Sequence, residues 1–465
     1  MQTVVPFRAW RYHRERAGGL ERLVAPPYDV IGPELRSRLY ARSRYNVVRI
    51  DLGMTTPSDN ECDNPYTRAA FQLGEWKEDG ILERDPEPSF TFVEESFTGP
   101  DGRQSTRRGF LGLLRLSEFG AGIVFPHEQT LSGPKEDRFR LMLATEMNLS
   151  PVFFLYDLPE DEISAAWQAG PGAGEPHRVL VDPEGSSDAT TTRLWRTADP
   201  FLLELVGRLL QGHQFIIADG HHRYETALRY QRHRLETADG GRGASAPDTA
   251  ECAEHEESSA YDYVLAYFSN MADPGLAIYG THRLVAGIDP GLIGALPEAL
   301  PPAFAVERLT PKRAEVSAEM AAEAIQAYLD KNPEGAFGLW GTALDAAYGI
   351  RLAHMDSPRA PTPGHSNAYQ DLDVTVLQSL VLEKHLGITP ADMAADRHVK
   401  FFKDPRDAFE RLAGGEFQVG FFMNPTSLAQ VREVALAGER MPQKATFFYP
   451  KLPTGLVFQD LSGTQ

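Results

Sequence analysis

Residues 215–227, FIIADGHHRYETA, decide how this chain is interpreted. The apolar run at 215–218 has the length of a buried strand, and the residues from Tyr224 onward are compatible with a helix. Gly220 lies at the joint, where a residue without a side chain lets the backbone turn tightly and approach a ligand closely. The stretch therefore predicts a strand, a tight turn and a helix in direct succession.

The start of that helix is a predicted anion site. The first N–H groups of a helix have no partner within it, and the helix dipole adds partial positive charge there. His221, His222 and Arg223 add imidazole and guanidinium groups at the same point, directly after Asp219 and Gly220. We expect Gly220, His221, His222 and Arg223 to form an anion site suited to phosphate, with Asp219 beside it. The alternative is a polar turn whose basic side chains are only solvated.

Two of these residues have further candidate roles. A carboxylate beside a phosphate site commonly binds Mg²⁺ through oxygen, which makes Asp219 the predicted magnesium ligand. Its competing role is the N-cap of the following helix. His222 is also a candidate catalytic residue, because an imidazole can transfer a proton near neutral pH.

A second cluster occupies residues 125–138, FPHEQTLSGPKEDR. His127 and Glu128 are candidate catalytic residues that would accept a proton from a substrate hydroxyl group. Lys135 and Arg138 are predicted to bind phosphate oxygens. The alternative is an exposed loop that leads into a capped helix.

A third cluster lies near the C-terminus at residues 441–451, MPQKATFFYPK. Lys444 and Lys451 flank a strand-like run at 447–449. Lys444 is a candidate ligand-binding residue. The alternative is that both lysines are solvated at the ends of an apolar strand. Residues 281–283, Thr-His-Arg, are expected to form a surface turn, and the alternative is that His282 and Arg283 face the same pocket.

Composition limits the possible classes of protein. The chain has 465 residues, 42% hydrophobic and 24% charged, which predicts two or three globular domains. Its net charge of −19 disfavours a broad nucleic-acid surface but allows a local basic pocket. Only two cysteines are present, so neither a disulfide framework nor a cysteine zinc cluster is expected. Without a signal-peptide pattern or a membrane-spanning apolar run, we expect a cytoplasmic protein.

Several common catalytic motifs are absent from the sequence. There is no G-x-x-x-x-G-K-[ST] loop and no G-x-G-x-x-G turn after a strand, which disfavours P-loop and Rossmann chemistry. Neither an H-E-x-x-H zinc helix nor a G-x-S-x-G nucleophile turn is found. The anion site at residues 219–223 therefore remains the main chemical signal.

The order of predicted elements favours an α+β fold with a mixed sheet, because strands and helices mingle without regular alternation. We expect helices at residues 67–79, 137–147, 202–211, 223–234, 314–330 and 374–386. We expect strands at residues 89–97, 108–116, 151–156, 263–269, 337–340, 348–352 and 447–449, and the start of a strand at residues 46–49.

We expect three regions along the chain. The body spans residues 1–285 and carries mobile surface insertions at about 159–187 and 236–260, where large apolar residues are scarce. An α/β extension spans 286–355. After a proline-rich break, a C-terminal α/β region at 368–465 contributes to the body.

The chain resembles DUF1015, a bacterial and archaeal family of unknown function. The matching segments lie in order along nearly the whole sequence: APPYDVI (25–31), YNVVRIDLG (45–53), RRGFLGLLRL (107–116), HEQTLSGPKEDRFRLMLATEMNLSPVFFLY (127–156), IADGHHRYETAL (217–228), THRLV (281–285) and MPQKATFFYPKLPTGLV (441–457). The insertion at 236–260 is an embellishment of that pattern.

The core motif also resembles that of the ParB and sulfiredoxin superfamily. There a strand, a Gly-x-[His/Arg]-Arg turn and a helix grip nucleotide phosphates. Gly220, His222 and Arg223 match the turn, and Tyr224 and Ala227 match packing positions of the helix. The resemblance implies a ParB/sulfiredoxin-like nucleotide-binding core within the body.

Some members of that superfamily resemble free-serine kinases, which transfer a phosphoryl group from ATP or ADP to serine, and the family tends to be associated with serine biosynthesis. The resemblance implies a nucleotide-dependent phosphotransferase acting on a small hydroxyl compound such as free L-serine, with ATP or ADP and Mg²⁺ as cofactors. The alternatives are a phosphatase of phosphoserine or a related ester, and a non-enzymatic nucleotide-sensing regulator. The acidic chain departs from the DNA-binding branch, so no nucleic-acid or membrane partner is expected. The sequence predicts no oligomeric state.

Overall fold

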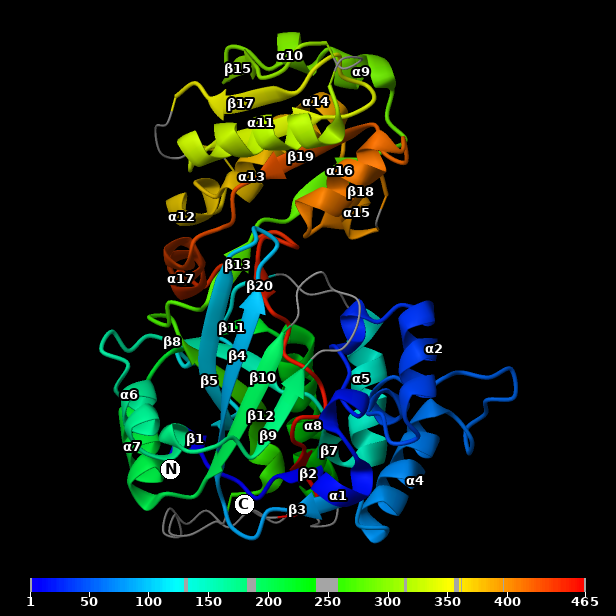
Figure 1. The fold of residues 1–465 in the computed structure, drawn as a ribbon, viewed down its shortest axis with the longest axis vertical. Helices are drawn as coiled ribbons and strands as arrows, with labels where there is room; N and C mark the ends of the chain where they lie inside the picture. The colour runs from blue at the N-terminus through cyan, green and yellow to red at the C-terminus, as the bar shows by residue number, and fades with distance from the viewer. Residues whose placement is uncertain are drawn as a thin grey trace.

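The protein folds into a large body and a smaller lobe above it, joined by a short two-stranded ribbon (Figure 1). This computed structural model describes residues 2–463 except 129–132, 182–189, 240–257, 313–315, 355–358, 361 and 396. Both ends of the chain lie in the body (Figure 1).

The body is built on a nine-stranded sheet in the order β6-β11-β8-β12-β5-β4-β10-β9, with β1 paired to β5. Its strands are β1 (Val4–Val5), β4 (Phe90–Thr98), β5 (Gln104–Arg115), β6 (Val124–Pro126), β8 (Val152–Tyr156), β9 (Arg178–Val181), β10 (Thr191–Thr197), β11 (Phe215–Asp219) and β12 (Tyr263–Asn270). The β11–β6 and β12–β8 pairs are parallel and the other pairs are antiparallel. The predicted α+β class with a mixed sheet is confirmed.

Helices cover both faces of this sheet. Apolar residues of α6 (Glu162–Ala169), α7 (Pro200–Leu209) and α8 (His221–Asp239) share one buried cluster with one face of the sheet. The other face shares its core with the N-terminal helices. These are α2 (Pro33–Arg42), α3 (Val48–Asp51) and α4 (Pro65–Glu78), with α5 (Gly133–Thr145) packed between α4 and α8. Helix α8, which begins at the predicted anion site, belongs to the first of these two layers.

The strand predicted to begin at residues 46–49 is wrong. Asn46 is buried, and its side-chain oxygen accepts a hydrogen bond from the Val48 N–H at 3.0 Å, which starts helix α3 instead. Val48 and Ile50 are both fully buried. A short apolar run satisfies a buried strand and a buried helical turn equally well, so local pattern did not distinguish them.

The surface insertion predicted at 159–187 is wrong for its first part. Helix α6 buries Ile163 and Trp167, and the Trp167 ring stacks on Phe92 of β4 with centroids 5.1 Å apart. Two well-spaced apolar residues are enough to anchor a short helix among many small and polar ones. The insertion predicted at 236–260 falls mainly outside the described residues.

The smaller lobe contains a six-stranded antiparallel sheet in the order β15-β17-β16-β19-β14-β18. Its strands are β14 (His282–Val285), β15 (Phe304–Arg308), β16 (Ala336–Trp340), β17 (Tyr348–Leu352), β18 (Val399–Phe402) and β19 (Val419–Met423). The helices α11 (Ala318–Lys331) and α16 (Pro405–Ala413) pack together on one face. The segments 286–355 and 368–465 thus contribute strands to the same sheet.

The chain finally returns from the lobe to the body. Strand β20 (Phe447–Tyr449) pairs with β13 (Ala277–Tyr279) to form the connecting ribbon. Strand β21 (Gln459–Asp460) pairs with β7 (Met147–Asn148). The third predicted cluster, residues 441–451, therefore lies next to the end of β11.

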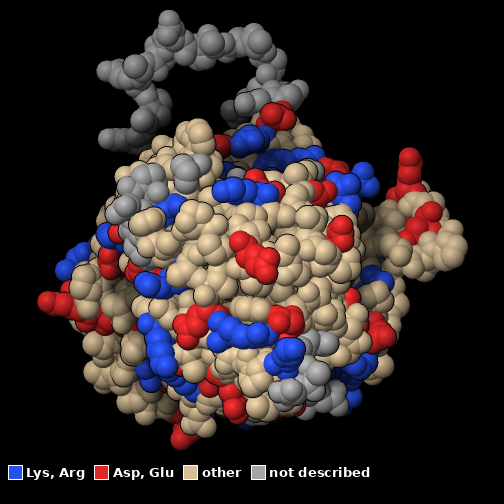
Figure 2. Space-filling model, turned by 90° about the horizontal axis from the view of Figure 1, so that it is seen from above, with Lys and Arg blue, Asp and Glu red and all other residues tan. Residues whose placement is uncertain are grey.

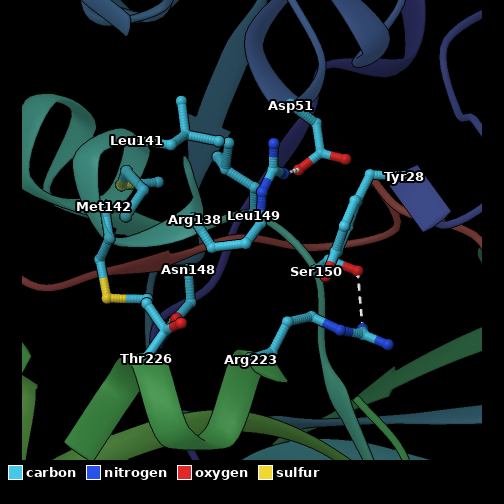
Figure 3. A pocket seen from close by; sticks show the side chains of 11 residues that line it. Tyr28, Asp51, Arg138, Leu141, Met142, Asn148, Leu149, Ser150, Arg223 and Thr226 are labelled. Carbon is cyan, nitrogen blue, oxygen red and sulfur yellow. Dashed lines mark hydrogen bonds and ion pairs between the residues drawn. The ribbon is translucent and has the colours of Figure 1, made fainter. Parts of the chain in front are cut away.

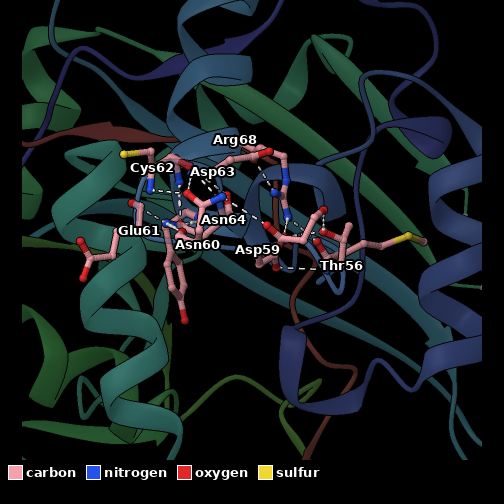
Figure 4. Close-up of polar contacts among 12 residues, drawn as sticks. Thr56, Asp59, Asn60, Glu61, Cys62, Asp63, Asn64 and Arg68 are labelled. Atoms are coloured by element: carbon pink, nitrogen blue, oxygen red, sulfur yellow. Dashed lines mark hydrogen bonds and ion pairs between the residues drawn. The ribbon is translucent and has the colours of Figure 1, made fainter.

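The exposed polar loop before α4 is held by its own contacts (Figure 4). Asn64 caps the helix by accepting from the Tyr66 and Thr67 N–H groups. Arg68 pairs with Asp59 at 2.9 Å and with Asp63 at 2.5 Å. These acidic side chains are therefore neutralised within the loop.

Charges of both signs are interspersed over the face seen from above (Figure 2). No broad patch of a single sign is visible among the described residues of that face. Within the part of the chain that the structure describes, no helix combines the length and apolar character needed to cross a membrane.

Candidate functional site

The site is built around the N-terminus of α8. Gly220 has φ +90°, a backbone conformation that favours glycine, and it reverses the chain between β11 and the helix. The Tyr224 N–H donates to the Gly220 carbonyl at 3.0 Å and closes the first turn. Because the first N–H groups of an α-helix have no acceptor within the helix, this end of α8 suits an anion.

Asp219, the last residue of β11, is held between two cations. One carboxylate oxygen contacts the Lys451 ammonium group, and the other lies 2.7 Å from Arg223 Nη2. Burial alone would raise its pKa, but Lys451 and Arg223 hold the pKa of Asp219 well below its usual range. Both oxygens of the predicted magnesium ligand therefore face cationic side chains.

Arg223 connects the helix to the start of β8. It donates to Ser150 Oγ at 2.9 Å, to the Pro151 carbonyl oxygen and to Asp219. On the same side it lines a small cavity of about 40 Å³ together with Tyr28 and Arg138 (Figure 3). The guanidinium group is thus fixed in place beside the helix N-terminus.

His127 and His221 lie together behind the site. The His127 N–H donates to His221 Nε2 at 3.2 Å, and the two rings are 4.8 Å apart. Both ring nitrogens of His127 are engaged, Nδ1 with the Ile217 carbonyl oxygen and Nε2 with Thr446 Oγ1 at 2.8 Å. Burial lowers the pKa of His127 to about 4 and that of His221 well below its usual value. Both imidazoles are therefore neutral near pH 7. Their hydrogen bonds connect the end of β6 with β11 and with Thr446.

Glu128 follows His127 and lies at the more open side of the site. Its Oε1 accepts from the Lys444 N–H at 3.0 Å, and burial raises the pKa of the Glu128 carboxyl. The Glu128 carboxylate acts electrostatically on His222, a half-buried residue whose pKa is lowered by burial. Glu128 is thus partly buried, and its carboxyl has an increased affinity for a proton.

The other predicted residues occupy the surroundings of the helix. Lys135 forms an ion pair with Glu225 on α8. Arg138 pairs with Asp51 at 3.0 Å and with Asp137 at 2.6 Å. Lys444 contributes its backbone N–H to Glu128, whereas it is Lys451 whose side chain contacts Asp219. Residues 127–128, 219–223 and 444–451 are therefore adjacent in space.

Sequence reasoning missed Lys403, which comes from the smaller lobe directly after β18. Its ammonium group lies 4.1 Å from the centroid of the Phe447 ring. Burial, Lys451 and Lys444 together lower the pKa of Lys403 to about 8. No local signal marks this lysine, since the pairing of β18 with β14 brings it here.

Two more charged groups belong to the surroundings of the site. Asp29 is exposed, and its charge acts on both His222 and Lys403. The surface turn predicted at 281–283 is wrong, because Arg283 is 4% exposed in β14 and its Nη2 lies 3.3 Å from the Lys444 carbonyl oxygen. Strand pairing on both sides of β14 explains the burial.

A larger cavity of about 380 Å³ begins beside Lys403 and Lys451. Glu95, which is fully buried, also lines it. Most of the remaining lining is apolar: Val24, Ala25, Pro26, Val30, Leu35, Leu39, Leu180, Phe447, Tyr449, Pro450 and Pro453. A cavity of this size, with cations at one end, suits a ligand that has both an apolar and an anionic part.

Replacement of Gly220 by alanine is expected to displace Arg223. A Cβ at Gly220 would lie 2.9 Å from the guanidinium group. Gly120 has the same φ of +90°, but a Cβ added there would meet no atom within 4 Å, so Gly120→Ala imposes the backbone strain alone. We expect both variants to lose about 1–2 kcal/mol of unfolding free energy, and only Gly220→Ala to lose anion binding as well. Denaturant unfolding and phosphate titration measure the two effects, and equal phosphate binding by both variants would contradict this account.

The family model described as "Protein of unknown function (DUF1015)" matches residues 4–375, which is most of the chain. The chain belongs to the DUF1015 family. No curated protein matches it significantly.

Solved structures similar to this DUF1015 protein share little sequence with it. A variant of free serine kinase in complex with ADP is 13% identical, with a TM-score of 0.33, over 73% of this chain and 88% of that one. A conserved hypothetical protein from Pyrococcus furiosus is 15% identical, with a TM-score of 0.30, over 73% and 93% of the two chains. SbnI from Staphylococcus aureus is 11% identical, with a TM-score of 0.30, over 76% and 84%.

Proposed function

We propose that this protein is a nucleotide-dependent phosphotransferase that acts on a small hydroxyl compound, with free L-serine as the first candidate acceptor. One observation carries the proposal: Arg223, Lys451 and Lys403 gather at a helix N-terminus in a chain of net charge −19. Such a concentration of positive charge at the N-terminus of a helix suits the phosphates of a nucleotide.

The larger cavity supports ATP or ADP as the phosphoryl donor. Its cationic end, at Lys403 and Lys451, adjoins the helix N-terminus, and its apolar walls suit the base and ribose. Asp219 in its present pairing does not fit the role of magnesium ligand, because Lys451 and Arg223 occupy both of its oxygens. We assign to Asp219 the positioning of these two cations.

The proposed reaction is a direct displacement. The acceptor hydroxyl oxygen bonds to the terminal phosphorus, the bond from that phosphorus to the bridging oxygen breaks, and the shortened nucleotide leaves. The hydroxyl proton passes to the Glu128 carboxylate, whose raised pKa favours its uptake. Arg223 and Lys451 neutralise charge on the phosphoryl oxygens. His222 is the second candidate proton acceptor, and His127 is a positioning residue.

A single set of incubations tests the proposal. The protein is mixed with L-serine and either ATP or ADP, and phosphoserine is measured by mass spectrometry. Phosphoserine formation that requires both reactants would support the transferase. Release of phosphate from phosphoserine alone would identify a phosphatase, and nucleotide binding without turnover of any hydroxyl compound would favour a regulator.

Nucleotide affinity is expected to fall as the pH rises from about 7 to about 9. Lys403 has a pKa lowered to about 8, so it is charged below that pH and neutral above it. An anion binds the charged form, and its affinity is lost as Lys403 releases its proton. Calorimetric titration with ADP at several pH values measures the effect. Lys403→Arg, which stays charged throughout, should remove this decline; a decline of the same size in the variant would assign it to another group.

A further inference from the structure

The small cavity beside Arg223 presents a carboxylate oxygen that no protein group uses among the described residues. Asp51 in α3 is 4% exposed and lines this cavity (Figure 3). Its Oδ1 accepts from Arg138 Nη1 at 3.0 Å, whereas its Oδ2 is buried without a hydrogen-bond partner in the part of the chain that the structure describes. A buried carboxylate oxygen without a donor is costly, so the site is complementary to a ligand that brings one.

The rest of the cavity supplies positive charge and donors. Arg138 lies 4.3 Å above the Tyr28 ring and is held by Asp51 and Asp137. Arg223 reaches the cavity from α8, where its Nη1 donates to Ser150 Oγ. An acceptor oxygen at Asp51 and guanidinium groups nearby match a molecule with both an ammonium and a carboxylate group.

The size of the cavity limits the ligand. Its volume of about 40 Å³ is far below the 380 Å³ of the cavity beside Lys403. One water needs roughly 10–15 Å³ of such space, so the cavity holds about three waters or a comparably small solute. A nucleotide is excluded by size, which leaves solutes no larger than a short amino acid.

We propose that this cavity is the acceptor subsite and that it binds a small α-amino acid, with the ammonium group on Asp51 Oδ2 and the carboxylate group balanced by Arg138 and Arg223. The assignment of an acceptor rests on the proposed transferase function. Arg223 is shared between the two ligands, because its Nη2 faces Asp219 and its Nη1 faces Ser150. Arg223 thereby joins the amino-acid subsite to the phosphate site.

Calorimetry on the wild-type protein tests the subsite directly. L-serine is compared with 3-hydroxypropionate, which lacks only the ammonium group, in the absence and in the presence of ADP. We expect serine to bind between about 10-fold and 100-fold more tightly, the usual effect of a charge-assisted hydrogen bond in a buried site. Equal affinities, or no serine binding in either condition, would overturn the subsite.

Asp51→Asn supplies the matched variant. Its affinity for serine should fall to that for 3-hydroxypropionate, while its affinity for ADP remains unchanged. Asp63→Asn, in the exposed loop, should leave both affinities unchanged. If Asp51→Asn fails to fold, the wild-type comparison still decides the question.

The two proposals fail in different ways. Binding of ADP without any preference for the ammonium group would leave the transferase and remove the acceptor subsite. Serine binding through Asp51 in a protein that binds neither ATP nor ADP would keep the amino-acid site and remove the transferase.

Discussion

Arg223→Ala should weaken nucleotide binding by about 100-fold to 1,000-fold, because truncation of one partner in a buried charge network removes its bonds and leaves the others unpaired. Arg223 is 13% exposed and contacts Asp219, Ser150 and the Pro151 carbonyl oxygen. Its loss removes a side chain that binds phosphate and leaves Lys451 as the one remaining cation that contacts Asp219 among the described residues. Calorimetric titration with ADP and ATP measures the change.

Arg229→Ala is the matched control on the same helix. Arg229 is 46% exposed and pairs with Glu136 at 2.7 Å, away from the helix N-terminus. Its replacement should leave nucleotide affinity within about twofold, because exposed ion pairs contribute little. Arg223→Lys separates charge from shape: a lysine keeps the charge but cannot serve three partners, so an intermediate affinity is expected. Wild-type affinity in a folded Arg223→Ala protein would remove Arg223 from the site.

Glu128→Gln should lower kcat by about 100-fold to 10,000-fold and leave nucleotide affinity nearly unchanged, since a general base acts in the transition state rather than in binding. The amide retains an oxygen for the Lys444 N–H but cannot take a proton. In the wild-type protein, kcat should fall as the pH is lowered. The midpoint of this fall should lie above 4.5, the ordinary pKa of glutamate, because burial raises the pKa of Glu128. The Glu128→Gln variant should not show this fall in kcat at low pH. Steady-state rates of phosphoserine formation measure both effects.

Three further variants serve as controls for Glu128→Gln. Glu118→Gln alters an exposed glutamate that pairs with Arg232, and it should leave kcat unchanged. Asp29→Asn and His222→Asn test the other two groups that face the same space. A full loss of turnover in either one, with near-normal rates in Glu128→Gln, would move the proton acceptor to that residue.

The strand, turn and helix at residues 215–227 were predictable because every requirement is local. An apolar run of strand length, a glycine at the reversal and helix-compatible residues after it are adjacent in the chain. The structure has β11 (Phe215–Asp219), Gly220 at φ +90° and α8 from His221. The helices predicted at 67–79 and 202–211 and the strands predicted at 89–97 and 263–269 also correspond to observed elements, whereas β10, β14, β15, β18 and β19 were not predicted.

The roles of individual side chains were harder to predict from the sequence. His127 and Glu128 are neighbours in the sequence, yet His127 is fully buried with both ring nitrogens engaged, and Glu128 is not. The difference arises from β11 and the Thr446 segment, which enclose one side chain and leave the next at the opening. Burial of this kind depends on elements distant along the chain, since Ile217 lies 90 residues beyond His127.

By itself the sequence determined the family, the α+β class and the strand, turn and helix around Gly220, because these follow from residue types at short spacing. Tertiary structure alone decided that Lys451 rather than Lys444 contacts Asp219, that Lys403 arrives from the smaller lobe, and that Asp51 keeps an oxygen without a partner among the described residues, beside Arg138. The physical reason is that charge and desolvation act through space. Distant segments brought together by strand pairing determine which groups are buried, paired or left available.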